Sequence, residues 1–112
     1  MTANRQYIDL LLTCADKPEA DKIARALLEA KLIACAKQLP VGSDFLWHGA
    51  VDHNDEILLV MESAADLFDA VEAKVAELHS YDTFVLQAVP FVRVSSKATT
   101  WLEENLQNLP KN

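Results

Sequence analysis

Two residues, Cys14 and His79, have side chains that suggest metal chemistry. The cysteine ends an apolar segment, and the histidine lies where a helical pattern ends. A thiolate and an imidazole together suit copper or zinc, so the pair predicts a site for copper or another divalent cation. Two ligands per chain are too few for a tight structural site. The alternative is that Cys14 packs as a small apolar residue and that His79 interacts with a helix C-terminus, where a partly cationic imidazole is favoured.

The remaining cysteine and histidines are weaker candidates. Cys35 lies in an apolar run and is expected to be a buried thiol. A disulfide with Cys14 is not expected, because an intervening strand would hold the two cysteines roughly 10 Å apart, beyond the ~7 Å limit for bridging. His48 and His53 are expected to face solvent. The sequence offers no nucleophile–histidine–acid set, glycine-rich phosphate loop or catalytic carboxylate pair, so no catalytic residue is predicted.

Three apolar segments are predicted to be strands. They cover residues 7–14, 57–61 and 84–89. The first two are apolar at nearly every position, which is typical of central strands. Pro90 cannot donate a hydrogen bond to a ladder, so the last strand is expected to end at a sheet edge or a bulge. Its first residues, Phe84 and Val85, favour an early start for it.

Apolar residues at helical spacing predict a first helix over residues 18–30. Asp16 is the predicted N-cap, and Glu19, three residues later, completes a capping box. Pro18 is tolerated in the first turn because that turn does not need its N–H.

A second helix is predicted over residues 64–79. Its start is placed near Ser63, with Asp66 three residues later. A short last helix is expected to be capped by Ser95 or Ser96. The apolar positions of this last helix are Ala98, Trp101, Leu102, Leu106 and Leu109.

Residues 31–51 form an unusually apolar connection between these elements. Pro, Gly, Ser and Asp in residues 40–44 favour a turn. The segment therefore predicts a bent strand or a long β-arm that turns near residues 40–44. A polar turn is expected afterwards, at residues 51–55.

The resulting order is β-α-β-β-α-β with a trailing helix. This order is the split βαβ pattern of ferredoxin-like α+β folds, in which one antiparallel sheet carries two helices on one face. The opposite face has only the short last helix available to cover it. The apolar area exposed on that face would then exceed the area that a soluble monomer normally tolerates, which predicts an oligomer.

The chain also resembles the CutA family of divalent-cation tolerance proteins. The likeness rests on Lys-Leu-Ile-Ala-Cys-Ala at residues 31–36, Leu39-Pro40 and Trp47-His48-Gly49. The family pattern is roughly K-L-A-A-C, I-P-G and W-E-G, and the likeness runs from about Ile8 to Leu106. It implies one CutA-like domain over residues 1–112 with the same ferredoxin-like fold. It also implies a homotrimer in which three sheets pack around a threefold axis and the arms pair between neighbours.

The resemblance implies site residues as well. In CutA proteins that bind copper, the described ligands are a Cys late in the first strand and a His-His pair before Pro-Tyr. His79 matches the second His, Leu78 replaces the first, and Leu12 occupies the Cys position, two residues before Cys14. A cleft between subunits is implied near Tyr81, Cys35 and Trp47.

Several positions depart from the family pattern of His-Pro-Tyr-x-x-Pro-Glu. Residues 79–85 read His-Ser-Tyr-Asp-Thr-Phe-Val, without either Pro or the Glu. His48 stands where the family has Glu, and Glu62 where it has Lys. These changes affect the small-molecule cleft that the family implies, and they leave the fold pattern intact.

Composition narrows the possible partners. The chain has 112 residues and a net charge of −7, which argues against nucleic acid or an anionic membrane as the main partner and is compatible with cations. No segment approaches the ~20 apolar residues of a membrane span, and the first residues lack the apolar region of a signal peptide. The cytoplasm is the expected compartment.

Three functions are compared on this basis. The favoured one is a CutA-like trimeric protein of metal tolerance, a binding module without enzymatic activity. A regulatory module of the related PII type would need basic residues near the central turn, and Arg and Lys are nearly absent between Gln38 and Ala73. A small enzyme with a site between subunits would need titratable residues converging on Tyr81, and only Asp82 adjoins it in sequence.

Overall fold

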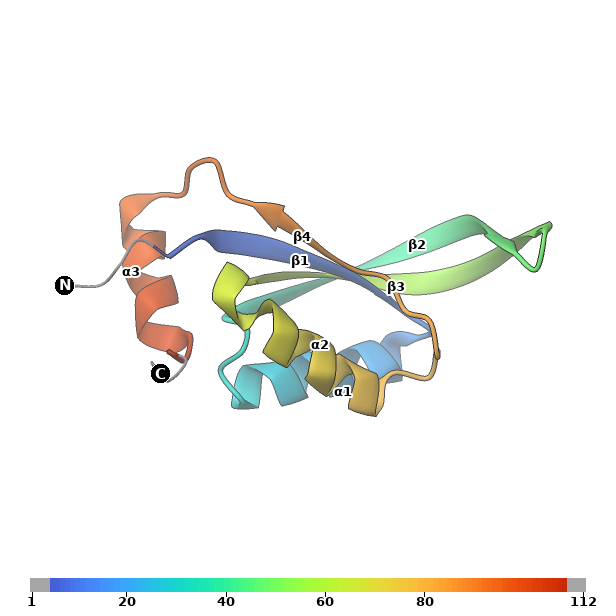
Figure 1. Ribbon diagram of the computed structural model, residues 1–112, viewed down its shortest axis with the longest axis horizontal. Helices are drawn as coiled ribbons and strands as arrows, with labels where there is room; N and C mark the ends of the chain where they lie inside the picture. The colour runs from blue at the N-terminus through green and yellow to red at the C-terminus, as the bar shows by residue number, and fades with distance from the viewer. Residues whose placement is uncertain (1–4, 109–112) are drawn as a thin grey trace.

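A four-stranded antiparallel sheet in the order β2-β3-β1-β4 organises the chain. The computed structural model describes residues 5–108. Helices α1 and α2 cover one face of the sheet (Figure 1), as the split βαβ pattern predicted. In chain order the elements are β1 (Tyr7–Cys14), α1 (Lys17–Glu29), β2 (Cys35–Trp47), β3 (Ala50–Ala64), a 3₁₀ turn (Ala65–Leu67), α2 (Phe68–Leu78), β4 (Leu86–Pro90) and α3 (Ser96–Asn105).

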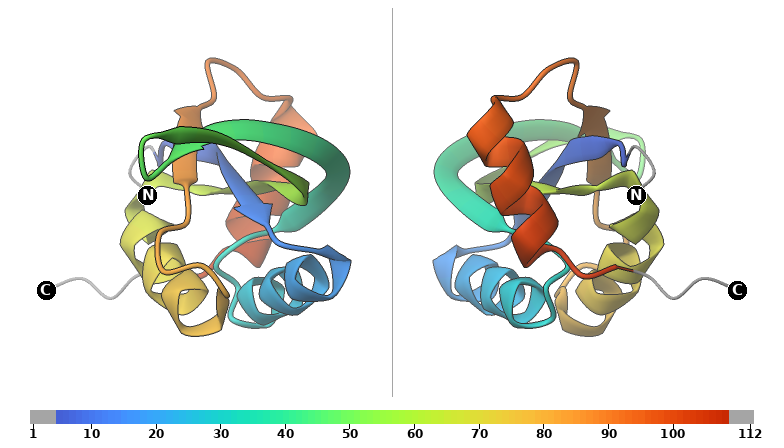
Figure 2. Two further views of the ribbon diagram at one scale, coloured as in Figure 1. Left: turned by 90° about the vertical axis from the view of Figure 1, so that its right-hand side faces the viewer. Right: turned by 90° about the vertical axis from the view of Figure 1, so that its left-hand side faces the viewer.

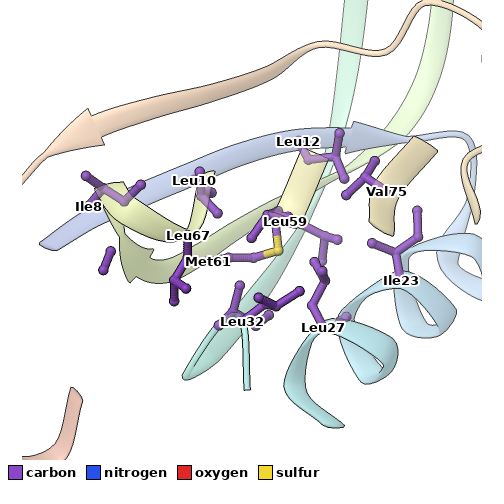
Figure 3. Close-up of a cluster of buried hydrophobic side chains, with 14 of the residues drawn as sticks. Ile8, Leu10, Leu12, Ile23, Leu27, Leu32, Leu59, Met61, Leu67 and Val75 are labelled. Atoms are coloured by element: carbon purple, nitrogen blue, oxygen red, sulfur yellow. The ribbon is translucent and has the colours of Figure 1, made fainter. Parts of the chain in front are cut away.

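The core lies between the sheet and these two helices. Alternate residues of β1 point into it, because successive side chains of a strand face opposite sides. They meet side chains of β3, α1 and α2 (Figure 3), and all are almost completely buried. The central members of this core are Leu10, Leu12, Ile23, Leu27, Leu59, Met61, Val71 and Val75.

The start of α1 is confirmed in outline. The Asp16 carboxylate accepts a hydrogen bond from the Glu19 N–H at 3.0 Å. A capping box also requires the Glu19 side chain to accept a hydrogen bond from the Asp16 N–H. This second hydrogen bond is not formed. The Glu19 side chain accepts instead from the N–H of Ala15 at 2.7 Å, because this carboxylate is also held from the far side by the end of α2.

The predicted turn at residues 40–44 is wrong. Strand β2 continues through it, and the reversal occurs at His48 and Gly49, whose φ angles are 50° and 80°. Pro40 is tolerated because β2 is an edge strand whose only neighbour is β3. The polar segment 51–55 is likewise strand and not turn. We call residues 41–56 the arm: they pair only with each other and project from the sheet (Figure 1).

The predicted start of the second helix is also wrong. Ser63 lies within β3, where its buried hydroxyl donates to the carbonyl oxygen of Leu32 at 2.7 Å. Helical geometry begins at Ala65 with a 3₁₀ turn, and α2 follows from Phe68. Asp66 binds Arg5 at 2.6 Å. A serine before a helical pattern cannot be distinguished in sequence from a buried strand serine.

Strand β4 starts later than expected, at Leu86. Phe84 remains in the preceding loop, where its ring stacks on His79 with centroids 5.3 Å apart. Pro90 ends an edge strand paired only with β1, as predicted.

Helix α3 closes one end of the core and leaves the open sheet face bare (Figure 2). Leu102 and Leu106 are buried there. Ser95 is the N-cap residue, but its side chain makes no capping hydrogen bond. Leu109 lies outside the described residues. Within residues 5–108, every helix is too short or too polar to cross a membrane.

Candidate metal centre

Cys14, Glu19 and His79 come together where β1 ends, α1 begins and α2 ends. One sulfur, oxygen or nitrogen atom from each lies within 4.8 Å of the others. Among residues 5–108 this is the only group of three or more such side chains with metal-ligand spacing. The fold therefore brings the predicted pair into proximity and adds Glu19, which the sequence had assigned only to the helix start.

The His79 ring is fully buried and uses both nitrogens within the chain. Nε2 lies 2.9 Å from the carbonyl oxygen of Thr13, and Nδ1 accepts the N–H of Tyr81 at 3.0 Å. Because a carbonyl only accepts, Nε2 carries the proton and the ring is satisfied as a neutral imidazole. The ring thus bonds to strand β1 and not to the last carbonyl groups of α2, whereas Cys14 is buried in the core, as the alternative to a metal site predicted.

Glu19 connects three elements through its carboxylate. One oxygen accepts the N–H of Ala15 at 2.7 Å, and the other accepts the N–H of Ser80 at 2.6 Å. Burial alone would raise the pKa of this carboxyl group, but the hydrogen bonds from Ala15 and Ser80 lower it further than burial raises it. The carboxylate therefore stays ionised and faces the other two ligand atoms.

Cys14 is completely buried beside this carboxylate. Burial, together with the negative charges of Glu19 and Glu56, raises the pKa of its thiol to about 12. The free thiol is therefore protonated at neutral pH. A bound cation would reverse this preference, because a coordinating thiol loses its proton.

Tyr81 and Glu56 form a second contact next to this group. The Tyr81 hydroxyl donates to the Glu56 carboxylate at 2.8 Å. Burial, followed by this hydrogen bond and the charge of Glu56, raises the pKa of Tyr81 to about 12. Sequence reasoning missed Glu56, which is 8% exposed; its position next to the predicted strand at 57–61 was the available signal. An open groove of about 540 Å³ beside it is lined by Asp16, Val41 and Asp55 among others.

The three residues predicted near a cleft between subunits, Tyr81, Cys35 and Trp47, do not all meet within one chain, because Cys35 and Trp47 are far apart. They lie at opposite ends of β2, separated by a distance on the order of 40 Å at the usual rise per residue. Cys35 is half-buried, not buried as predicted, because it starts an edge strand. Trp47 is 52% exposed at the arm tip. The cleft between subunits therefore stays a prediction about an assembly.

The predictions that the two cysteines are not bridged and that His48 and His53 face solvent are confirmed. Both cysteines are free, and β3 lies between their strands, with Cys14 opposite Ile57 and Cys35 opposite Glu62. His48 and His53 are exposed on the arm.

Comparison with known proteins agrees with the fold and with the resemblance seen in the sequence. The family model described as CutA1 divalent ion tolerance protein matches residues 8–105. This chain belongs to the CutA1 family. Divalent-cation tolerance proteins CutA of Archaeoglobus fulgidus and Thermus thermophilus are each 31% identical to it. The alignments cover 88% and 86% of this chain and 96% and 94% of theirs.

Solved CutA structures share the architecture. CutA1 from Oryza sativa superposes with a TM-score of 0.90 at 27% identity, over 93% of this chain and 96% of the other. The Archaeoglobus fulgidus protein, called a periplasmic divalent cation tolerance protein, gives a TM-score of 0.88 at 30% identity, over 90% of this chain and 99% of its own. The family name refers to ion tolerance and to no enzymatic reaction.

Proposed function

We propose that this CutA protein functions in the response to divalent or cuprous ions as a non-enzymatic homotrimer, with Cys14, Glu19 and His79 as its cation site. The observation that carries the proposal is the thiol, carboxylate and imidazole within 4.8 Å of one another. This group of ligand atoms occurs in a chain that belongs to a family named for divalent ion tolerance.

The three ligands fit soft and borderline cations. Thiolate and imidazole favour cuprous copper or zinc, whereas Mg²⁺ and Ca²⁺ prefer sites built from oxygen alone. Three protein ligands leave a fourth coordination position open for another ligand.

Binding at this site has two structural consequences. Cys14 must lose its proton, and His79 must release the Tyr81 N–H from Nδ1 if that nitrogen becomes the ligand. Because one thiol proton is displaced, the affinity falls about tenfold for each unit by which the pH is lowered.

Titration of untagged protein with Zn²⁺ by calorimetry, and with Cu⁺ by chelator competition, tests the site. We expect Cys14→Ser and His79→Ala to weaken binding by at least about tenfold. Cys35→Ser, which alters the other thiol, is the matched control and should bind as the unaltered protein does. Equal affinity in all four proteins would refute the site, and the absence of binding to the unaltered protein would refute the metal function.

The trimer is supported by the apolar surface that a single chain leaves exposed. Leu39 and Val89, both 48% exposed, lie on the open face of the sheet with Leu11, Leu58 and Val60. On the arm, Leu46 and Val51 are 76% and 77% exposed. Three copies would cover these surfaces, and the neighbouring arms would bring Tyr81, Cys35 and Trp47 to intersubunit clefts.

We place the protein in the cytoplasm, away from nucleic acid and membranes. The two free thiols suit a reducing compartment, and the net charge of −7 disfavours polyanionic partners. Since the Archaeoglobus fulgidus relative is called periplasmic, cell fractionation is the deciding measurement.

A further inference from the structure

The arm carries a cross-strand group formed by Asp44, His53 and Asp55. His53 lies directly opposite Asp44 in the pairing of β2 with β3, and Asp55 is two residues further along β3, on the same face. The imidazole Nδ1 is 2.5 Å from Asp44 Oδ1, and Nε2 is 3.1 Å from Asp55 Oδ1. One ring therefore connects carboxylates from both strands of the hairpin.

Gly42 makes room for this ring. It lies opposite Asp55 in β2, diagonal to His53. A Cβ atom at this position would lie only 3.2 Å from the Cε1 atom of the His53 ring. A larger residue here would require the ring to shift by a few tenths of an ångström.

The geometry requires a positive charge on the ring. A neutral imidazole has one N–H donor and one acceptor nitrogen, so one nitrogen would face a carboxylate with no proton between them. The imidazolium donates to both. Asp44 faces His53 from β2, Asp55 faces it from β3, and Asp52 accepts the backbone N–H of His53 at 2.8 Å. The arm sequence contains no Lys or Arg to neutralise these acids.

We propose that protonated His53 is a pH-sensitive lock that holds the two strands of the arm together. Within one chain, the arm lacks the additional neighbouring strand that supports the inner half of β3. A two-stranded hairpin is only marginally stable by itself, so a charged contact between its strands affects how often the arm opens. The contacts of the lock all lie within one chain, and none of them involves a residue of the candidate metal centre.

The direction of the pH effect follows from the same contacts. The hydrogen bond to Asp44, followed by that to Asp55, raises the pKa of His53 above its usual value of 6.5. The stabilising contribution is complete below the pKa of the unfolded chain and is lost as the pH rises through the raised pKa. The arm is therefore held closed most firmly in mildly acidic solution and loosens as the pH rises through the raised pKa of His53.

Two NMR measurements on the full chain test the lock. Titration of the imidazole nitrogens from about pH 5 to pH 9 should give a His53 midpoint above 6.5 that falls in Asp44→Asn. Hydrogen-exchange protection factors should show that arm amides lose protection relative to amides of β1 as the pH rises, by at least about threefold. This loss should be absent in His53→Gln and unchanged in the control His48→Asn, which alters the other arm histidine.

Either measurement can overturn the proposal. A His53 midpoint at or below 6.5 in the unaltered protein would refute it without reference to any variant. A protection ratio that is independent of pH, or equally dependent on pH in His53→Gln, would show that another group controls the arm.

Discussion

At the scale of single residues, Glu19 contributes more than the helix start that its sequence position suggests. Its carboxylate binds the N–H groups of Ala15 and Ser80, which are more than sixty residues apart in sequence. It thereby fixes the end of α2 against the start of α1 and places His79 beside Cys14. The candidate metal centre depends on this one side chain for its shape.

Replacing Glu19 with Gln should destabilise the metal-free protein. The amide can accept through only one atom, so one of the two N–H groups loses its charged acceptor, which costs about 1–3 kcal/mol of unfolding free energy. Urea unfolding in the presence of a chelator measures this change. Glu29→Gln is the matched control. The Glu29 side chain is 70% exposed, and its ion pair with Arg25 is long, at 3.8 Å. Equal stability of the two variants would contradict the connecting role of Glu19.

At the scale of elements, β3 combines two different structures. Its inner half, residues 57–64, pairs with β1 throughout and with β2 as far as Glu62, and its residues face the core and the open side alternately. Its outer half has only β2 as a neighbour and forms one side of the arm. Adjacent leucines of the inner half therefore have different roles: Leu59 is fully buried and Leu58 faces the open side.

Alanine substitutions at these two leucines should separate folding from assembly. Leu59→Ala leaves a cavity in the core and should lower the free energy of unfolding by about 2–5 kcal/mol. Leu58→Ala removes a partly exposed side chain, so we expect a smaller loss of stability and weaker association of subunits. Denaturant unfolding and dilution monitored by light scattering measure the two effects. Equal destabilisation by both substitutions would mean that the two faces are not distinct.

At the scale of the whole molecule, the single chain is elongated because the arm projects from the sheet. Its extents are 51 × 28 × 25 Å, and the arm adds surface without adding to the core (Figure 1). A soluble monomer gains nothing in stability from such an element, and its exposed edge strand would attract other chains. An arm that pairs with neighbouring subunits explains both features.

Light scattering at micromolar concentration should therefore find three chains of 12.4 kDa. A variant in which an Asn-Gly turn joins Ser43 to Asn54 shortens the arm while keeping the observed strand register. It should keep the folded core and dissociate toward the monomer. A stable monomer of the unaltered chain would contradict the assembly, a dimer would contradict its threefold symmetry, and a trimer of the shortened chain would contradict the role of the arm.

Much of the fold and part of the candidate site could be predicted from the sequence. A nearly continuous apolar run located β1, and helical spacing placed α1 and α2 within a few residues, because burial leaves these patterns of apolar residues in the sequence. The element order then implied the split βαβ sheet and put Cys14 and His79 at neighbouring element ends. The start of α2 was misplaced because Ser63 bonds to Leu32, a contact between segments far apart in sequence.

The order of the elements, the open sheet face and the pair of Cys14 and His79 follow from the sequence alone. The folded structure was needed to show that Glu19 joins this pair, that Tyr81 reaches Glu56, and that the arm reverses at His48 and Gly49. The physical reason is that hydrophobic spacing is local to each element, whereas a hydrogen bond across the fold needs both partners in place. The arm shows the same limit, since most of its residues are exposed within one chain and burial therefore leaves little record in its sequence.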